Sequence, residues 1–551
     1  MVEEVNHIYI GVTSMRTCLG DKVQTFREIS RGQTGLSYSD DYSMYVGVSD
    51  VRMYDDCTRF ESLMIEQIEK VILQSGLPIN QDVQLVISTT KGNVSLLADD
   101  CENIPERAYL YKSAEVIAKH VGFQNQPIVV SNACISGVSA FIVAKDLLQS
   151  GKYRHVIVAG GDVLSEFITA GFASFKSISP NPCRPYDAER DGLSLGEAAG
   201  AVLLTINKEY ADEAQLRLSG GSVTNDANHI SGPSRTGDGL YYAICNAMLE
   251  AGVEAEDVGF INAHGTATRY NDEMESKAMA WAGLNNKPLN SFKGYIGHTL
   301  GASGVVETIL CIEQLKLGYI FGTAGFVSSD TPHLLNVSAK QQTIENSCCV
   351  KTASGFGGCN AAIVLCMGFR EQYAHIVKRE AEIVAEYTLP QSEIPFAEFI
   401  RSEFKAFGQS NMKFYKMSNM SKALYVAVEN LLTQASMDDI EPTRRAIILA
   451  NKVSSLDADV EHQLILNQKL AEGASPAAFV YTLANVAAGE MCIRHKIQGD
   501  NTFFIEDKNV GFVEEYSRRI VENNRADAVI YGWCDYLKGN WNVSIKLLKV
   551  K

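Results

Sequence analysis

Short apolar runs rich in β-branched residues alternate with longer amphipathic segments between Ile8 and Leu204. Three of the runs have the length and composition of buried strands, and they cover residues 84–89, 127–131 and 155–161. The segment 60–76 instead carries apolar residues at the spacing of one helix face and ends at Gly76, a residue that commonly terminates helices. A second helix is predicted over about 136–149. This alternation predicts an α/β fold with buried strands.

The same alternation continues from about Leu216 to Gly368. Strand-like segments cover 257–265 and 361–368, and a helix is predicted through 305–318. These segments indicate a second α/β half. The next segment, 369–395, is charged, poor in β-branched clusters and contains prolines near its end, so we expect a linker there.

The last part of the chain resembles a copy of the first part. Three pairs of segments carry the similarity: 417–437 with 54–77, 444–452 with 83–91, and 498–537 with 123–164. Aligning Gly511 with Gly137 places Lys508 opposite Cys134, so the copy keeps the pattern of the first part and lacks its thiol. We therefore expect four parts, with bounds at 1–210 (first half), 211–368 (second half), 369–395 (linker) and 396–551 (inactive copy of the first half).

Composition is that of a globular protein, with 46% hydrophobic and 21% charged residues in a chain of 551. The length allows several units that each bury a core. Thirteen cysteines show no C-x-x-C pair and no spacing typical of a zinc site, which predicts reduced thiols in a cytoplasmic protein and no metal site.

Charge and hydropathy exclude several classes of partner. A net charge of −16 without an evident Lys/Arg cluster argues against nucleic acid. The longest uncharged stretch, 121–144, is interrupted by polar residues and by Pro127 and is not expected to span a membrane. The N-terminal segment carries acidic residues where an export signal has basic ones, so we expect no signal peptide.

Three residues are candidates for chemistry. Cys134 stands directly after a predicted strand and before a predicted helix, where the helix N-terminus would lower the pKa of its thiol. His264 and His298 each follow a short apolar run and precede small residues, which is typical of functional loops at strand ends. A buried inert cysteine and structural histidines are the plain alternatives, and these residues favour catalysis only when taken together.

Five motifs along the chain resemble those of the elongating β-ketoacyl-[acyl-carrier-protein] synthases, and they occur in the order found in that family. The motifs are SNACISG (131–137), PYDAERDGLSLGEAAG (185–200), NAHGTATRYNDEME (262–275), FKGYIGHTLGASGVVE (292–307) and SGFGGCN (354–360). The resemblance implies a thiolase-like layered αβαβα fold built of two duplicated halves, here followed by a degenerate copy of the N-terminal half.

The resemblance also assigns the chemistry. Cys134 would accept an acyl group from a carrier thioester, with an oxyanion hole made by the backbone N–H groups of Cys134 and Phe356. His264 and His298 would stabilise the enolate that forms when a malonyl group loses CO2. Initiating synthases have asparagine in place of the second histidine, so His298 favours elongation.

Further residues match the supporting positions of the family. Lys293 and Glu307 correspond to a charged pair that supports the histidines. Thr266 and Thr268 correspond to the hydroxyls that hold the phosphopantetheine arm. Phe356 corresponds to a gate for the acyl chain, on a loop whose freedom comes from Gly355, Gly357 and Gly358.

The resemblance implies an acyl carrier protein as the partner that brings the acyl and malonyl groups. Phosphopantetheine arrives on that carrier, so no tightly bound cofactor is expected. The family implies a homodimer, or a heterodimer with another synthase-like subunit. Fatty acid, polyene (including aryl polyene) and polyketide elongation all remain open as pathways.

Two other functions stay open at this point. The chain could be a non-catalytic scaffold or chain-length-factor-like subunit, which the copy over 396–551, with Lys508 at the nucleophile position, resembles. A thioesterase or acyltransferase that uses only Cys134 is a third possibility. The full set of candidate residues favours the condensing enzyme.

Overall fold

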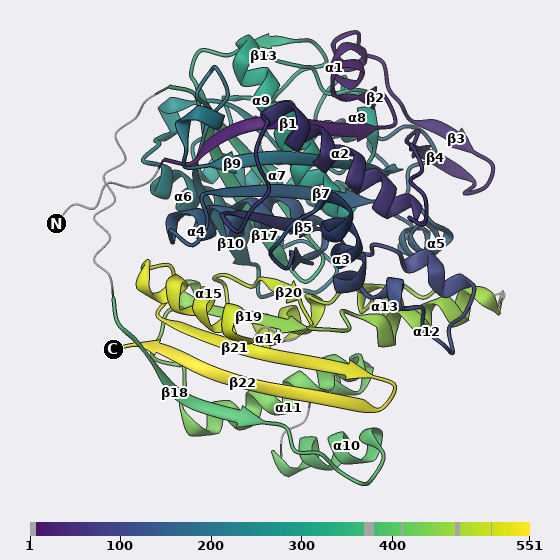
Figure 1. Cartoon of the computed structure of the whole chain (residues 1–551), viewed down its shortest axis with the longest axis vertical. Coiled ribbons are helices and arrows are strands. Elements are labelled where there is room, and N and C mark those ends of the chain that lie inside the picture. Colours follow the sequence, from purple (N-terminus) through teal and green to yellow (C-terminus); the bar gives the residue numbers. More distant parts are fainter. Residues whose placement is uncertain (1–6, 369–378, 409–410, 469–473, 508–509) are drawn as a thin grey trace.

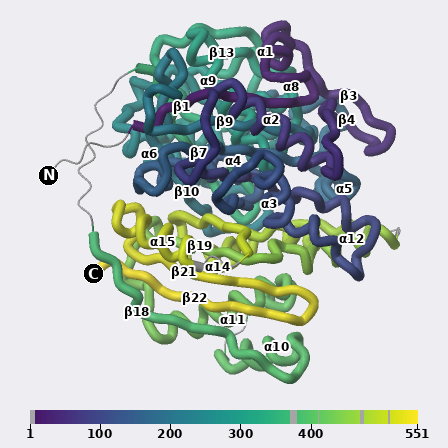
Figure 2. Tube along the Cα trace, in the orientation of Figure 1, coloured from purple at the N-terminus to yellow at the C-terminus, as the bar shows by residue number. Residues whose placement is uncertain are grey.

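The first half of the chain builds a five-stranded mixed sheet. The computed structural model describes residues 7–368, 379–408, 411–468, 474–507 and 510–551 (Figure 1, Figure 2). The spatial strand order is β6 (Ile128–Val130), β5 (Val83–Ser88), β7 (His155–Asp162), β9 (Ala198–Thr205) and β1 (Tyr9–Thr17). The strands predicted over 84–89, 127–131 and 155–161 are confirmed as β5, β6 and β7 within a residue or two at each end.

The second half repeats this arrangement. Its order is β12 (Pro288–Asn290), β11 (Val258–Asn262), β16 (Cys348–Gly355), β17 (Cys359–Cys366) and β10 (Arg217–Asn225). In both sheets the first three strands are parallel and the last two run antiparallel to their neighbours. The prediction of two duplicated α/β halves is confirmed.

Two helices form the layer between these sheets. They are α4 (Ser136–Gln149), which packs on β7 and β10, and α9 (Ser303–Leu317), which packs on β9 and β16. A Cβ on Gly137 would lie 2.8 Å from the Cα of Gly304, so only glycine allows the two helices to cross this closely. Cys134 and His298 stand just before these helices, and the crossing therefore brings both residues to one place.

Outer helices complete the layers. On the first sheet lie α2 (Arg59–Ser75) and α3 (Leu110–Val121); on the second lies α6 (Asp238–Ala251), with α7 (Arg269–Trp281) beside it. The predicted helix over 60–76 is confirmed as α2, which begins with a capping box at Thr58 and ends at Gly76 in a left-handed conformation. The result is the layered αβαβα order.

Beyond residue 379 a third sheet has the same strand order and directions as the first. Its strands are β20 (Phe503–Ile505), β19 (Arg445–Asn451), β21 (Ala528–Leu537), β22 (Asn540–Val550) and β18 (Ala381–Thr388). We refer to residues 379–551 as the C-terminal module. The expectation of a linker over 369–395 is wrong for 381–388, because this segment is β18. Only Ala385 of β18 is buried, and such an exposed, charged edge strand has the composition of a linker. Residues 369–378 and Lys508 lie outside the described residues.

The first sheet continues into the C-terminal module. β20 pairs antiparallel with β6, with Phe504 opposite Val130 and Ile505 opposite Val129. In Figure 1 the module, coloured green to yellow, lies alongside the first two sheets. Two ionic contacts cross the same boundary. Lys91 Nζ lies 2.6 Å from Asp459 Oδ1, and Arg525 bridges Asp146 and Asp500.

The helix of the module that corresponds to α4 differs from it on one face. α15 (Val510–Glu522) packs on β19 and β21 and carries the ion pairs Glu514–Arg518 and Glu515–Arg519. Glu515 also pairs with Lys152, and Arg519 donates to the Asp146 carbonyl oxygen, so this second pair lies against the first half. In α4, nearly every residue is buried between two sheets. The half-buried charges of α15 are thus paired with each other or with the first half, and the helix needs no second sheet of the module to cover it.

The expectation of reduced cysteines needs one correction. Cys348 and Cys366 form a disulfide between paired residues of β16 and β17. The pairing depends on strand register, which the sequence does not give. The other eleven cysteines are free. No helix among the described residues is both long enough and apolar enough to cross a membrane.

Candidate active site

Cys134 lies in the turn η3 (Ala133–Ile135), between β6 and α4. The turn is a tight elbow, because Ala133 has a φ of 48°, a left-handed conformation that is rare for residues with a side chain. Ser136 fixes the elbow: its Oγ donates to the Ala133 carbonyl oxygen over 2.6 Å and accepts from the Asn132 N–H over 2.8 Å. The elbow sets the thiol at the end of the strand, as the sequence predicts.

The environment of the thiol differs from the expectation. Burial raises the pKa of Cys134 to about 12, although the charge of Lys293 and the N–H groups of Cys134 and Phe356 act in the opposite direction. The predicted lowering of the pKa by the helix N-terminus is therefore outweighed by desolvation. The N–H groups of Cys134 and Phe356 both act on this sulfur, which is the pair of donors expected for an oxyanion hole.

This raised pKa has a measurable effect on alkylation. We expect the rate of Cys134 modification by iodoacetamide to rise about tenfold per pH unit from roughly pH 6 to 9, because the thiolate fraction grows in that proportion below the pKa. Quenched samples analysed by peptide mass spectrometry would give the rate at this residue alone. A plateau near neutral pH would contradict the raised pKa, and the Cys134→Ala variant supplies the background.

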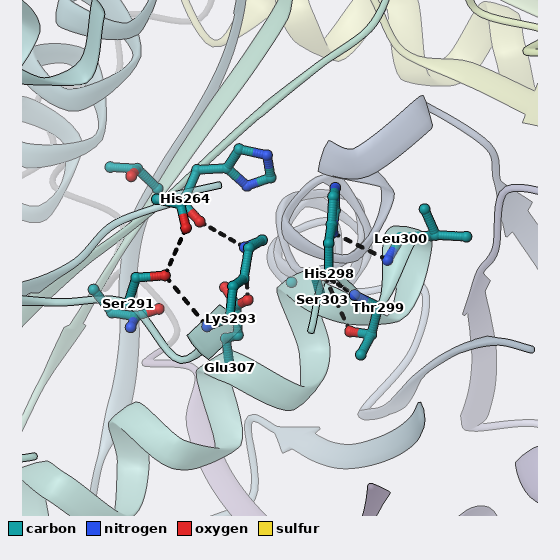
Figure 3. Close-up of polar contacts among 12 residues, drawn as sticks. His264, Ser291, Lys293, His298, Thr299, Leu300, Ser303 and Glu307 are labelled. Atoms are coloured by element: carbon teal, nitrogen blue, oxygen red, sulfur yellow. Dashed lines mark hydrogen bonds and ion pairs between the residues drawn. The ribbon is translucent and has the colours of Figure 1, made fainter. Parts of the chain in front are cut away.

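The two histidines face each other across the site. His264 follows β11, and His298 follows the short helix α8 (Lys293–Ile296). Their ring centroids lie 5.1 Å apart with nearly perpendicular planes, and Figure 3 shows the ring of His298 edge-on and that of His264 as an open ring. The Nδ1 atom of His298 accepts the N–H of Leu300 over 3.2 Å, so the neutral ring carries its proton on Nε2. The Nδ1 atom of His264 is buried and has no hydrogen-bond partner among the described residues.

Both imidazoles are neutral at physiological pH. Burial, reinforced by the nearby charge of Lys293, lowers the pKa of His264 and of His298 well below the usual range. A neutral imidazole can donate an N–H to a developing oxyanion without delivering a full proton. The pair is therefore suited to stabilise an enolate.

Under the histidines lies a buried ionic network. Lys293 Nζ donates to Glu307 Oε1 over 2.8 Å and to the backbone carbonyl oxygen of His264 over 2.6 Å (Figure 3). Lys351, on β16, pairs with the other oxygen of Glu307. Although burial alone would raise it, the two ammonium groups lower the pKa of Glu307, which stays ionised. The network fixes the backbone of His264.

Sequence reasoning missed two residues of this site. Lys351 is a single lysine in an apolar strand, a pattern that signals a buried charge with a partner. Glu275 lies within a quoted motif without an assigned role. Its carboxylate accepts the N–H groups of His264 and Gly265 over 2.8 and 2.7 Å and the hydroxyl of Tyr186 over 2.9 Å.

The remaining predicted site residues lie on two loops, one after His264 and one between β16 and β17. Thr266 and Thr268 follow His264, and their hydroxyl oxygens are 2.9 Å apart. Phe356 lies between β16 and β17; its ring centroid is 6.0 Å from that of Phe172, on α5 (Glu166–Ser174). Phe172 in turn lies 6.5 Å from the ring of His298. In the loop, Gly357 and Gly358 take left-handed conformations with φ of 92° and 71°, and a Cβ on Gly355 would lie 3.1 Å from the backbone nitrogen of Cys134.

Comparison with known proteins agrees with this geometry. The description "Beta-ketoacyl synthase, N-terminal domain" matches residues 50–209, and "Beta-ketoacyl synthase, C-terminal domain" matches residues 216–327. The chain is 29% identical over 356 residues to the chloroplastic 3-oxoacyl-[acyl-carrier-protein] synthase I of Hordeum vulgare, covering 58% of this chain and 76% of the barley protein. It is 34% identical over 245 residues to 3-oxoacyl-[acyl-carrier-protein] synthase 2 of Mycobacterium leprae, covering 42% of this chain and 58% of the relative.

Two solved structures extend the comparison. A ketosynthase in complex with its chain length factor from Xenorhabdus doucetiae is 25% identical, with a TM-score of 0.57 over 66% of this chain and 98% of that one. A PfaC ketosynthase–chain length factor structure is 14% identical, with a TM-score of 0.81 over 99% of this chain and 78% of that one. The second shares the fold of almost the whole chain, the C-terminal module included. The two matched domains and the named relatives confirm the family expected from the five motifs: the chain belongs to the β-ketoacyl synthases, which have the thiolase fold.

Proposed function

We propose that this chain catalyses a decarboxylative Claisen condensation between an acyl group carried on Cys134 and a malonyl group on an acyl carrier protein. The observation that carries the proposal is the pair of neutral, perpendicular imidazoles 5.1 Å apart, beside a thiol that two backbone N–H groups face. The barley and mycobacterial relatives are named for the same reaction.

The first step is acyl transfer. The sulfur of Cys134 attacks the carbonyl carbon of the acyl-carrier thioester, and the N–H groups of Cys134 and Phe356 hold the resulting oxyanion. The carrier thiolate leaves and takes up the proton that the Cys134 thiol loses. One thioester replaces another, so the step requires no external acid. Burial that keeps Cys134 protonated at rest limits side reactions of the thiolate before the substrate arrives.

The second step uses the histidines. When malonyl-carrier protein binds, its C–C bond to the carboxylate breaks, CO2 leaves, and the electron pair forms an enolate. The Nε2–H of His298 and the ring N–H of His264 donate to the enolate oxygen. The enolate carbon then attacks the acyl group on Cys134, and the C–S bond breaks with its electron pair going to sulfur. The Cys134 thiolate takes up a proton from water, and the β-ketoacyl product stays on the carrier. Lys293, Glu307 and Lys351 position the histidines and touch no reacting atom.

Substrate delivery follows from the same geometry. The phosphopantetheine arm of the carrier would reach the site past Thr266 and Thr268, whose hydroxyls can bond its amides. We assign the module, 379–551, the place that a second subunit takes in a synthase dimer, supported by the pairing of β20 with β6. Lys508 as a non-catalytic residue, a further synthase-like subunit and a cytoplasmic location stay predictions.

Loading with acyl-carrier proteins tests this function. We expect incubation with a panel of carriers bearing short, long, polyunsaturated or aryl acyl groups to leave one acyl adduct, confined to Cys134, because no other described cysteine has both neutral histidines and backbone N–H donors around it. Intact-protein mass spectrometry followed by peptide mapping gives the site and the preferred group. That preference separates fatty acid elongation from polyene or polyketide pathways. Absence of any adduct would favour the scaffold alternative.

A further inference from the structure

The glycine-rich loop that carries Phe356 lies against the C-terminal module. The contact is made by α14 (Val486–His495) and its N-cap residue, Asn485. Nδ2 of Asn485 donates to the carbonyl oxygen of Phe356 over 2.8 Å. One turn along α14, a Cβ on Gly489 would lie 2.6 Å from the carbonyl oxygen of Gly357, so only glycine lets the helix approach this closely. The same Nδ2 also donates to Cys359 Sγ over 3.6 Å, so the loop is held on the module by the amide of Asn485 and one close backbone contact.

The second half of the chain's condensing region holds the loop from the other side. Nδ2 of Asn225, on β10, donates to the carbonyl oxygen of Gly357 over 2.9 Å. The N–H of Gly357 donates to the carbonyl oxygen of Ile230 over 2.6 Å. Two successive carbonyl groups are therefore bound by side-chain amides from opposite sides, and only the amide of Asn485 belongs to the module.

The burial of Asn485 makes this bond significant. The residue is 2% exposed, and its Oδ1 atom has no partner among the described residues. A buried polar atom without a partner is destabilising, so an apolar side chain would be more stable at this place if the amide had no task. At the corresponding helix of the first half, α3, the N-cap residue is Tyr109, which offers no amide. The module has no second half, and therefore no glycine-rich loop that α3 could contact in the way α14 contacts the loop of Phe356.

We propose that Asn485 is a positioning residue for acyl transfer at Cys134. By fixing the carbonyl of Phe356, it keeps the adjoining N–H of Phe356 directed at the sulfur, where the oxyanion forms. The C-terminal module thereby takes part in the reaction while contributing no reacting group. This inference rests on the proposed function, because it concerns the same acyl-transfer step.

The variant Asn485→Asp tests the inference by its pH dependence. An ionised carboxylate has the size of the amide, donates no hydrogen bond and repels the Phe356 carbonyl, whereas a protonated carboxyl group can donate to it. We expect transfer from an acyl-N-acetylcysteamine thioester to Cys134 to fall about tenfold or more at pH 8, and the ratio to wild type to recover as the pH is lowered towards 6. Asn485 contacts Cys359, and Cys134, Cys492 and Asp226 act on the Cys359 thiol; all four groups are present in both proteins, so the ratio isolates the new carboxyl group.

Asn451→Asp is the matched control. Asn451 is buried in β19 of the same module, and its Nδ2 also donates to a backbone carbonyl over 2.8 Å, that of Ser454, away from the loop. We expect this variant to keep wild-type acyl transfer per folded molecule at every pH. A loss in Asn485→Asp that is the same at every pH would assign the residue to packing alone and overturn the proposal.

Hydrogen exchange separates this inference from the proposed function. Amide exchange of the peptide over 354–360 is expected to be faster in Asn485→Asp than in wild type at the same pH, and unchanged in Asn451→Asp. This readout needs no substrate. If wild type accepts no thioester, the proposed function fails and the loop exchange still decides the role of Asn485. Wild-type exchange in Asn485→Asp would overturn it.

Discussion

Replacing Cys134 by alanine is expected to abolish condensation, a loss of about a thousandfold or more. The acyl group would have no sulfur to bind, and no other free cysteine lies on the elbow that the N–H groups of Cys134 and Phe356 serve. The histidines and the network beneath them do not depend on the thiol. We therefore expect the variant still to release CO2 from malonyl-carrier protein.

Two measurements separate these effects: formation of β-ketoacyl-carrier protein, and release of labelled CO2 from malonyl-carrier protein. Cys534→Ala removes a buried thiol in the module, far along the chain from the site, and is expected to leave both rates unchanged. Unchanged condensation in Cys134→Ala would exclude the mechanism given above. Loss of both activities would show that the histidines act only when the thiol is present.

Ending the chain after Gly368 is expected to leave most of the protein insoluble. The truncation uncovers the edge of β6, where Val129 and Val130 lose their pairing with β20, and an exposed apolar strand edge is a site of aggregation. It also removes Asp459 and Arg525, the ionic partners of Lys91 and Asp146. Any soluble fraction would lack the Asn485 contact and is expected to load acyl groups poorly.

Solubility, size-exclusion chromatography and acyl loading of the truncated chain would check this result. Co-expression of residues 379–551 as a separate chain is the control, because it restores the same contacts without the covalent connection. A truncated protein that is soluble, dimeric and fully active would show that the module is dispensable.

Most of the architecture could be predicted from the sequence because local patterns report it directly. Buried strands such as β5 and β7 are continuous apolar runs, and α2 is bounded by Thr58 and Gly76. The strand β18 could not be predicted in this way, because it is an edge strand with a single buried residue. Its charged composition is that of a linker. The disulfide of Cys348 with Cys366 depends on the register of two strands.

The candidate site divides in the same way. Residues within motifs, such as His264 and His298, could be found one by one. Residues that act through contacts distant in sequence could not: Lys351 reaches Glu307 across 44 positions, and Asn485 reaches Phe356 across 129. The sequence predicts a lowered pKa for Cys134, but burial outweighs the effect of the helix N-terminus, and burial is a property of the whole fold.

The sheet that continues from β6 into β20 lies within a single chain. A contact of this kind is intramolecular, so the fraction of molecules that form it does not depend on protein concentration. Dilution therefore does not dissociate it. Each pair of catalytic halves is synthesised together with one module, in a fixed one-to-one ratio, and need not find a partner among competing subunits. Specificity that separate subunits must encode in their interface is supplied here by covalent connection.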